Sequence, residues 1–189
     1  MTLSILICSL HSRHEKLTAL LKELLYQRND NELVEILTEI DNKEISTGAK
    51  RNILLQRATG KYIIFIDDDD WPEPCYISEL IQAATSDADC FAINGYITTN
   101  GANRIDWRLS KDYENVTIKE NGYKHVYLRK TNHITAVRRS IALQVGFPDK
   151  SNAEDKWYSD KVAPLCKTEY QIKPCMYHYR FQTHNKEYV

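Results

Sequence analysis

The sequence predicts an α/β fold, with a mostly parallel sheet flanked by helices, and two observations carry this prediction. First, the apolar run Tyr62–Ile66 is rich in β-branched and aromatic residues and stops at four consecutive carboxylates, Asp67–Asp70. An uninterrupted run of this length suits a strand buried on both faces of a parallel sheet. Second, the chain before it alternates apolar runs with segments of helical spacing, which implies parallel strands joined by right-handed crossovers.

Strands and helices are expected to alternate through the first hundred residues. Apolar runs predict the strands, and leucines spaced three and four residues apart predict the first helix. In chain order, the expected elements are a strand over 3–9, a polar loop at 11–14, a helix over 15–27, a strand over 33–40, a helix over 49–58, the strand over 62–66, a helix over 75–84 and a strand over 90–99. Gly60 is expected to end the second helix in the left-handed conformation, and Asn100–Gly101 to form a tight turn.

After residue 100 the pattern is less regular. Scattered aromatic and β-branched residues over 104–127 predict short strands or loops. The later expected elements are a strand over 131–137, a short helix over 139–145 ended by Gly146, a helix that opens at 152–157 with two acids in its first turn, and an apolar-aromatic segment over 171–181. The chain has no internal repeat or linker, so its 189 residues are expected to form one domain.

Composition excludes several classes of protein. A formal net charge of -1 gives no general affinity for nucleic acid or anionic membrane, so any charged ligand must be recognised locally. Five cysteines without close spacing favour reduced thiols over a zinc site or a disulfide framework. No segment reaches the roughly 20 apolar residues of a transmembrane helix, and the N-terminus lacks a signal-peptide cleavage pattern. A soluble cytoplasmic protein is therefore expected.

The four carboxylates Asp67–Asp70 predict a metal site. In open α/β sheets, ligands bind beyond the carboxyl ends of the strands, which is where these acids are expected. Four adjacent like charges need a counter-charge, and a hard divalent cation with phosphate oxygens on its far side is the simplest partner. The alternative interpretation is a solvated acidic turn that caps the next helix.

Three stretches of the chain resemble the GT-A-fold nucleotide-sugar glycosyltransferases of family 2. They are Gly48–Asn52, Ala58–Trp71 and Asn152–Trp157. A DxD pattern after a strand, preceded by a GAxRN-like helix and followed by a Glu-Asp helix start, is typical of that family. The resemblance implies a Rossmann-like GT-A domain over 1–189, with a nucleotide-sugar half over about 1–100 and a smaller acceptor half over about 101–189.

The resemblance also implies which residues bind the donor. The end of the first strand and the loop after it match the part that holds base and ribose, the acid after the second strand packs against the base, and the polar start of the second helix reaches toward base and phosphates. The matching residues are Ser9, Arg13, Asp41, Lys50, Arg51 and Asn52. For Lys50 and Arg51 a solvated helix face is the alternative.

In the acidic run, the DxD pattern of the family aligns with Asp67, Asp68 and Asp69. By this alignment Asp67 approaches ribose and metal, Asp68 is a further donor-binding candidate, and Asp69 is the main metal ligand. Because the register is ambiguous by one residue, Asp68 and Asp70 also stay open as metal ligands. The implied metal is Mn²⁺ or Mg²⁺, which would neutralise the charge that develops on the leaving diphosphate.

The segment Tyr177–Arg180 resembles a Tyr-Tyr-Arg segment near the end of many relatives. In that family a histidine or arginine from this region reaches the metal or the diphosphate. The candidates in this chain are His178 and His184 as metal ligands and Arg180 as a donor-binding residue.

Glu154 and Asp155 resemble the ED motif of the family. Inverting transfer needs a carboxylate that removes the proton of the acceptor hydroxyl. Asp155 matches that base, and Glu154 is expected to hold acceptor hydroxyls or to orient it. The alternative is a pair at a helix N-terminus with an electrostatic role only. Trp107, His133 and Trp157 fall on the expected acceptor side.

Taken together, the resemblance implies a metal-dependent inverting glycosyltransferase of the hexosyl type. The donor is expected to be a UDP-sugar, with GDP and dTDP open as alternatives, and the acceptor a glycan hydroxyl, with specificity carried by residues 104–130. A partner chain or a homodimer is an open alternative for completing acceptor binding.

Three other functions compete with this interpretation. One is a non-catalytic relative that binds a nucleotide or a sugar. A phosphatase or phosphotransferase of the haloacid-dehalogenase type is less favoured, because the acidic run leads into Trp71–Pro72. A nucleotidyltransferase is disfavoured because residues 9–13 contain no glycine.

Overall fold

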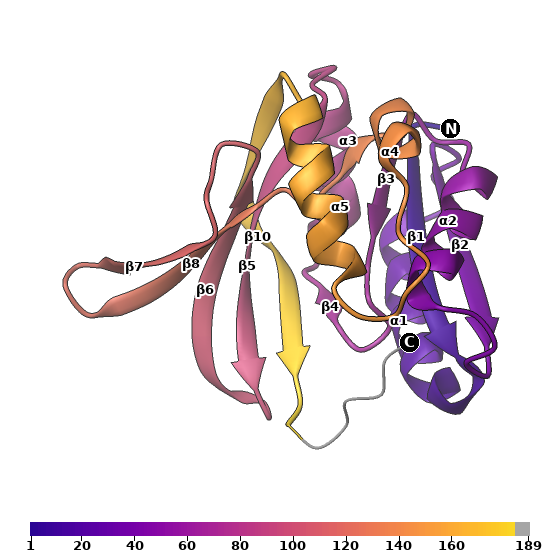
Figure 1. Cartoon of the computed structure of the whole chain (residues 1–189), viewed down its shortest axis with the longest axis horizontal. Coiled ribbons are helices and arrows are strands. Elements are labelled where there is room, and N and C mark those ends of the chain that lie inside the picture. The colour runs from indigo at the N-terminus through magenta and orange to yellow at the C-terminus, as the bar shows by residue number, and fades with distance from the viewer. Residues whose placement is uncertain (184–189) are drawn as a thin grey trace.

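The computed structural model describes residues 1–183, and its N-terminal half is built around three parallel strands (Figure 1). Strand β1 (Leu3–Leu10) lies between β2 (Val34–Asp41) and β3 (Tyr62–Phe65). All residues of β1 and β3 are buried, as expected for strands covered on both faces. The predicted strand–helix–strand units and their parallel pairing are confirmed.

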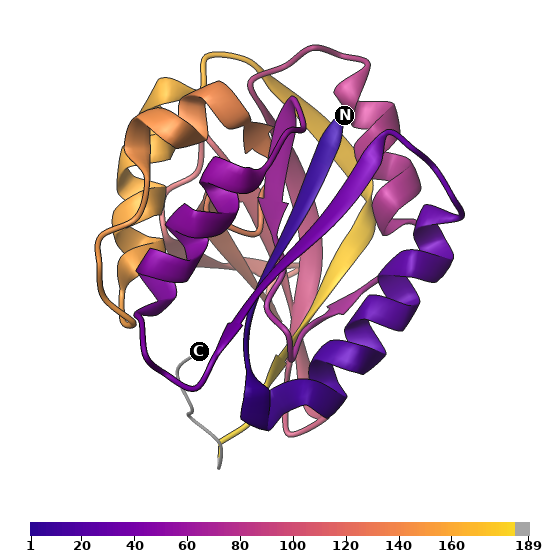
Figure 2. The same ribbon diagram turned by 90° about the vertical axis from the view of Figure 1, so that its right-hand side faces the viewer.

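Helices cover both faces of these strands (Figure 2). On one face lie α1 (His14–Arg28) and α3 (Tyr76–Ala84), whose leucines and isoleucine join alternate residues of β1 and β3 in one hydrophobic cluster. On the other face lie α2 (Thr47–Arg57), α4 (Arg139–Val145) and α5 (Glu154–Val162), which share a second cluster with the remaining strand residues. The alternation of strand side chains thus divides the core between two faces.

The second half of the chain extends the same sheet. Its strands are β4 (Trp71–Pro72), β5 (Cys90–Thr99), β6 (Ala102–Ser110), β7 (Val116–Glu120), β8 (Lys124–Lys130), β9 (Val137–Arg138) and β10 (Glu169–Phe181). Two short 3-10 turns, His11–Arg13 and Ala163–Leu165, complete the elements of residues 1–183. The main sheet order is β2-β1-β3-β9-β5-β6-β8-β7, and β10 pairs with β5 and β4.

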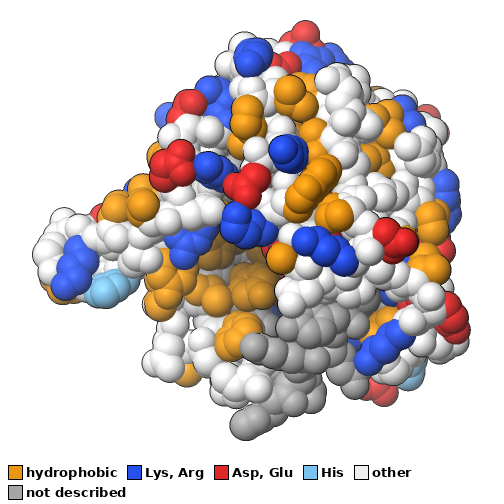
Figure 3. Space-filling model, viewed as in Figure 1, with side chains coloured by type: hydrophobic (Ala, Val, Ile, Leu, Met, Phe, Trp, Pro, Cys, Tyr) orange, Lys and Arg blue, Asp and Glu red, His pale blue; other side chains and the backbone are white. Residues whose placement is uncertain are grey.

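Strands β7 and β8 form a ribbon that projects from the body beside α5 (Figure 1). Strand β8 joins the sheet by parallel pairing with β6, and the ribbon, β6 and α5 border a hollow on the surface (Figure 3). Among the described residues, no helix combines the length and the hydropathy needed to cross a membrane.

Two local predictions are wrong. Gly60 is not left-handed: a Cβ there would lie 2.7 Å from the backbone nitrogen of Ser4, so glycine is needed for close approach to β1. Residues 131–136 do not form a strand, although they include the β-branched residues Thr131, Ile134 and Thr135. The side chain of Asn132 accepts a hydrogen bond from the Ile134 amide at 3.1 Å, and the resulting turn leaves only the two-residue β9.

Candidate active site

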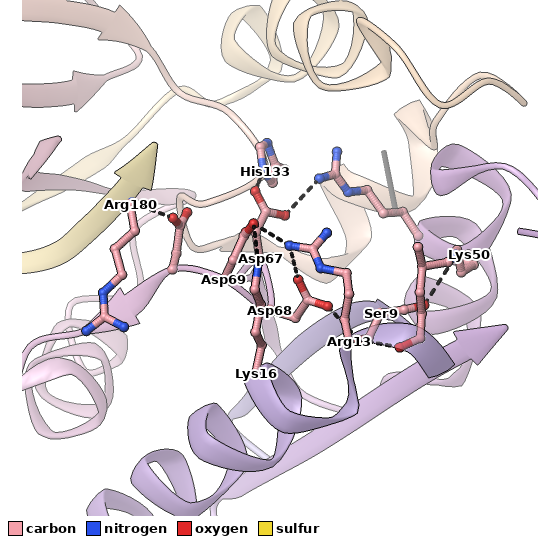
Figure 4. A network of polar contacts seen from close by, with 12 residues as sticks. Ser9, Arg13, Lys16, Lys50, Asp67, Asp68, Asp69, His133 and Arg180 are labelled. Carbon is pink, nitrogen blue, oxygen red and sulfur yellow. Dashed lines mark hydrogen bonds and ion pairs between the residues drawn. The ribbon is translucent and has the colours of Figure 1, made fainter. Parts of the chain in front are cut away.

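The site forms where the carboxyl ends of β1, β2 and β3 meet, as the acidic run predicts (Figure 4). Ile66 still bonds to β1, its amide donating to the Leu6 carbonyl at 3.1 Å. The chain leaves the sheet immediately after it, which places the four acids at the sheet edge beside the turn that follows β1. Each acid then meets a different set of partners.

Asp68 points inward and is fully buried. The Ser9 hydroxyl donates to its carboxylate at 2.5 Å, and the Arg13 guanidinium lies 2.8 Å from its other oxygen. Burial raises the pKa of Asp68 to about 6, although Arg13 and Ser9 act in the opposite direction. Asp68 therefore anchors the turn after β1 to the acidic run, and the expected donor-binding residues Ser9, Arg13 and Asp68 form one bonded group.

Asp70 is also buried, and it faces the C-terminal strand. Its carboxylate accepts hydrogen bonds from the Tyr177 hydroxyl and the Arg180 backbone amide, both at 2.8 Å. Burial, reinforced by the charge of Asp67, raises the pKa of Asp70 well above its ordinary value. Asp70 thus ties β10 to the acidic run, and both of its carboxylate oxygens accept hydrogen bonds, although the residue also borders a cavity.

Asp67 and Asp69 have the more open carboxylates, with side chains 34% and 35% exposed. Arg51 lies 3.2 Å and His133 3.4 Å from the oxygens of Asp67. Burial favours the protonated form of Asp67, but His133, Arg51 and Arg13 outweigh it and lower its pKa. Asp69 pairs with Arg13 and lies 3.8 Å from Lys16. Asp67 and Asp69 are thus the two more open acids of the run, and Asp68 and Asp70 are the two buried ones.

Within residues 1–183 no cluster of three or more His, Cys, Asp and Glu side chains is placed to hold a metal ion. The two more open carboxylates, Asp67 and Asp69, nevertheless fit Mg²⁺ or Mn²⁺, because Mg²⁺ is usually held by one or two carboxylates together with substrate phosphates. Asp67 and Asp69 both line the same cavity, so such an ion would have room for diphosphate oxygens.

Lys50 and Arg51 are buried, so the alternative of a solvated helix face is wrong for both. Lys50 donates to the Ser9 carbonyl at 3.2 Å and pairs with Asp41. Burial acts to raise the pKa of Asp41, but Lys50 outweighs it and the pKa is lowered. This pair joins the ends of β1 and β2, and neither residue is among those that line the two cavities described below.

Arg51 links the two acidic motifs. Its guanidinium lies 2.8 Å from Glu154 and 3.2 Å from Asp67. The start of α2 reaches the segment before α5 because residue 48 is glycine: a Cβ on Gly48 would lie 1.9 Å from the Pro148 carbonyl oxygen. The same approach allows the Gly48 amide to donate to the Lys150 carbonyl at 3.1 Å. Helix α2 therefore positions the start of α5.

Asn52 has a structural role in this arrangement. Its side-chain amide donates to the Phe147 carbonyl and its oxygen accepts from the Phe147 amide, both at 2.8 Å. These two bonds occupy the polar end of the side chain on the segment that follows α4. Asn52 is not among the residues that line the two cavities described below.

Glu154 and Asp155 open α5 after a sharp turn, in which Ala153 has a left-handed φ of 57°. Glu154 is buried against Arg51, whereas Asp155 is partly exposed and accepts from the Lys156 amide at 2.7 Å. The two neighbouring carboxylates thus differ in environment: Glu154 is paired inward, and Asp155 faces open space.

Two cavities adjoin at Asp155. One, of about 310 Å³, is lined by Arg13, Arg51, Asp67, Asp69, Asp70 and the acids that open α5. The other, of about 320 Å³, extends toward β5, β6 and β8. The residues common to both are Asp67, His133, Asp155 and Tyr179. We call the first the acidic cavity and the second the aromatic cavity.

The expected C-terminal residues occupy different places. His178 stacks on Tyr96 with ring centroids 4.3 Å apart and its Nε2 lies 2.8 Å from the Thr98 hydroxyl, so the structure does not bring it to the acids. The Arg180 guanidinium lies over Trp71 and points away from the acids (Figure 4), although the residue borders the acidic cavity. His184 lies outside the described residues.

Sequence reasoning missed two residues of the site. Lys16 follows Arg13 by three residues at the start of α1, and this spacing could have placed both cations beside the acids. Tyr179 alternates with His178 and Arg180 on β10, so strand alternation could have turned it toward the cavities instead. Of the expected acceptor-side residues, His133 and Trp107 line the aromatic cavity, and Trp157 lines neither.

Known proteins resemble this chain in sequence and in fold. The sequence model of Glycosyl transferase family 2 matches residues 36–146. The putative glycosyltransferase EpsH of Bacillus subtilis is 28% identical over 142 residues, which cover 70% of this chain and 41% of that protein. The glycosyltransferase GlyA of Streptococcus pneumoniae is 25% identical over 154 residues, covering 76% of this chain and 22% of that protein. The chain therefore spans less than half the length of these two relatives.

Solved structures of TarS from S. aureus share the fold. Residues 1–349 of TarS, alone and in complex with UDP, superpose with a TM-score of 0.71 at 15% identity, covering 95% of this chain and 60% of that chain. The complex of the same fragment with UDP-GlcNAc gives a TM-score of 0.67 at 13% identity. At these identities the likeness concerns the fold, and it confirms the expected GT-A architecture.

Proposed function

Because the chain belongs to glycosyl transferase family 2, we propose that it transfers a hexosyl group from a nucleotide-sugar to a hydroxyl of a glycan acceptor. The observation that carries this proposal is the position of Asp155, a partly exposed carboxylate at the junction of two cavities. The donor would occupy the acidic cavity and the acceptor the aromatic cavity, so the reacting atoms would meet beside this side chain.

The donor in this proposal is a UDP-sugar bound through its diphosphate. Asp67 and Asp69 would hold Mn²⁺ or Mg²⁺, which neutralises negative charge on the departing diphosphate. Arg13 and Lys16 lie beside Asp69 and add positive charge near the same group. The choice of UDP is supported by the complexes of TarS with UDP and UDP-GlcNAc.

The transfer would proceed with inversion in a single displacement. The acceptor oxygen forms a bond to the anomeric carbon while the bond from that carbon to the diphosphate oxygen breaks, and Asp155 takes the proton of the acceptor hydroxyl. Glu154 does not need to touch the substrate, since its pairing with Arg51 holds the first turn of α5 in place. Glu154 is thus a positioning residue, and Asp155 is the proposed base.

Calorimetric titration with UDP, GDP and dTDP, each with and without Mn²⁺, tests the donor half of this proposal. We expect metal-dependent binding of UDP by the wild type and its loss in Asp69→Asn. Asp112→Asn, which changes an exposed acid that lines neither cavity, should bind like the wild type. If none of the nucleotides binds with Mn²⁺ present, the donor site is wrong and the acids would serve another phosphate chemistry.

A further inference from the structure

The aromatic cavity has an apolar floor made by the sheet. Its described lining includes Ile97, Trp107, Leu109, Tyr127 and Tyr179. The Trp107 indole can approach β5 closely because residue 95 is glycine, where a Cβ would lie 2.2 Å from the indole. Aromatic faces of this kind are suited to the apolar face of a sugar ring.

Three cations border this floor, and Figure 3 shows Lys and Arg side chains along the edge of the hollow. They are Arg129 and Lys130 at the end of β8 and Lys156 in the first turn of α5. The two elements are far apart in sequence, and the fold brings their positive charges to one opening.

The partners of these cations leave them available to a ligand. Arg129 donates to the backbone carbonyls of Val116 and Leu128, and its guanidinium lies 4.8 Å from the centre of the Tyr127 ring. Lys130 pairs at 3.1 Å with Glu114, whose side chain is 77% exposed, and Lys156 pairs at 2.6 Å with Asp160. Exposed ion pairs of this kind contribute little stability, so an anion could compete for the ammonium groups.

The charge of the cavity is uneven. Among its described lining residues, the carboxylates are Asp67 and Asp155, and both lie at the junction with the acidic cavity. The partners Glu114 and Asp160 do not line it. Outside that junction, the charged residues that line the aromatic cavity are therefore cations.

We propose that the acceptor carries an anionic group, a phosphate or a carboxylate, which Arg129, Lys130 and Lys156 bind while a sugar ring lies on the aromatic floor. This inference rests on the proposed function, because it takes the aromatic cavity as the acceptor site. The acceptor hydroxyl would then lie toward Asp155, and the anion toward the rim. Neutral glycans would lack the second of these two anchors.

The test compares three sugars that differ in one group: glucose, glucose 6-phosphate and glucuronate. Binding is measured by ligand-observed NMR with saturating UDP and Mg²⁺, which fill the acidic cavity and prevent the phosphate from binding there. We expect both anionic sugars to bind about tenfold more tightly than glucose, since a hydrogen bond to a charged group is worth at least this factor. Whichever of glucose 6-phosphate and glucuronate binds more tightly identifies the preferred anionic group as phosphate or carboxylate.

The double variant Lys130→Gln with Lys156→Gln should reduce the affinity for the anionic sugars to that for glucose. The matched control, Lys124→Gln with Lys161→Gln, removes the same charge from β8 and α5 outside the cavity and should keep the preference. Three outcomes would overturn the inference: equal binding of the three sugars, survival of the preference in the first variant, or binding of UDP while none of the three sugars binds.

The same experiment distinguishes a failure of the proposed function from a failure of this inference. If UDP does not bind with Mg²⁺ while the anionic sugars still bind through Lys130 and Lys156, the donor site is wrong but the cationic rim is supported as an anion site. Salt offers one more check: the preference for the anionic sugars should weaken as ionic strength rises, because it depends on charges near the surface.

Discussion

Arg51 is the side chain on which the geometry of the site depends most. Its guanidinium lies over the rings of Phe65 and Phe147, 5.7 and 5.4 Å from their centres, and its nitrogens reach both Glu154 and Asp67. A planar guanidinium can satisfy two carboxylates in different directions, whereas a lysine ammonium is a single point charge. Arg51 therefore couples the DxD loop to the ED turn.

Replacing Arg51 by Met should lower the free energy of unfolding by about 3 kcal/mol, because the buried Glu154 would lose its counter-charge. Urea denaturation of the wild type and the variant measures this difference. The control is Arg57→Met on the same helix, where the pair with Glu39 is exposed and a loss below about 1 kcal/mol is expected. Equal losses in the two variants would contradict the role of Arg51.

Asp155→Asn should reduce sugar transfer by about 10²-fold or more, the smaller end of the range for general-base catalysis. The affinity for UDP with Mn²⁺ should stay within about twofold of the wild type, since the amide keeps the shape of the side chain and the donor contacts of Asp67 and Asp69 are unchanged. The rate of transfer and the calorimetric affinity are measured on the same preparation. A comparable loss of both would exclude Asp155 as the base.

At the scale of elements, Glu35 holds the three N-terminal strands in register. A single carboxylate oxygen on β2 accepts from the Ser4 hydroxyl at 2.5 Å, from the Thr59 amide and hydroxyl at 2.5 and 2.9 Å, and from the Gly60 amide at 3.1 Å. These donors lie on β1 and on the turn before β3. Partial burial acts to raise the pKa of Glu35, but the hydrogen bonds outweigh it and the pKa is lowered.

Glu35→Gln should cost about 1 kcal/mol of stability at pH 7, because hydrogen bonds to a charged acceptor become bonds to a neutral one. Since the folded-state pKa lies below the ordinary value of 4.5, this contribution is fully present above pH 4.5 and is lost as the pH falls through the folded pKa. Denaturation curves of the wild type and the variant from pH 7 to pH 3 should therefore converge. Glu32→Gln, an exposed acid in the preceding loop, should show no such convergence.

At the scale of the whole molecule, local patterns predicted the fold and the acidic edge, but not the side-chain partnerships. The run Tyr62–Ile66 predicts a buried strand because every residue in it is apolar or aromatic. By contrast, the hydrogen bond between Tyr177 and Asp70 joins residues far apart in sequence, and no local sequence pattern predicts it. The burial of Lys50 and Arg51 could not be predicted from the sequence either, because a charged residue on a helix is expected to face solvent unless its partners are known.

The unequal burial of the sheet predicts how its stability is distributed. Strand β1 is buried throughout and paired on both edges. Among residues 1–183, by contrast, β7 pairs with β8 alone, and its residues are mostly exposed. Local opening is easiest where few apolar groups are buried. In hydrogen–deuterium exchange followed by mass spectrometry, peptides from β7 should therefore exchange first and those from β1 last. If the ribbon of β7 and β8 is protected as strongly as β1, this distribution of stability is wrong.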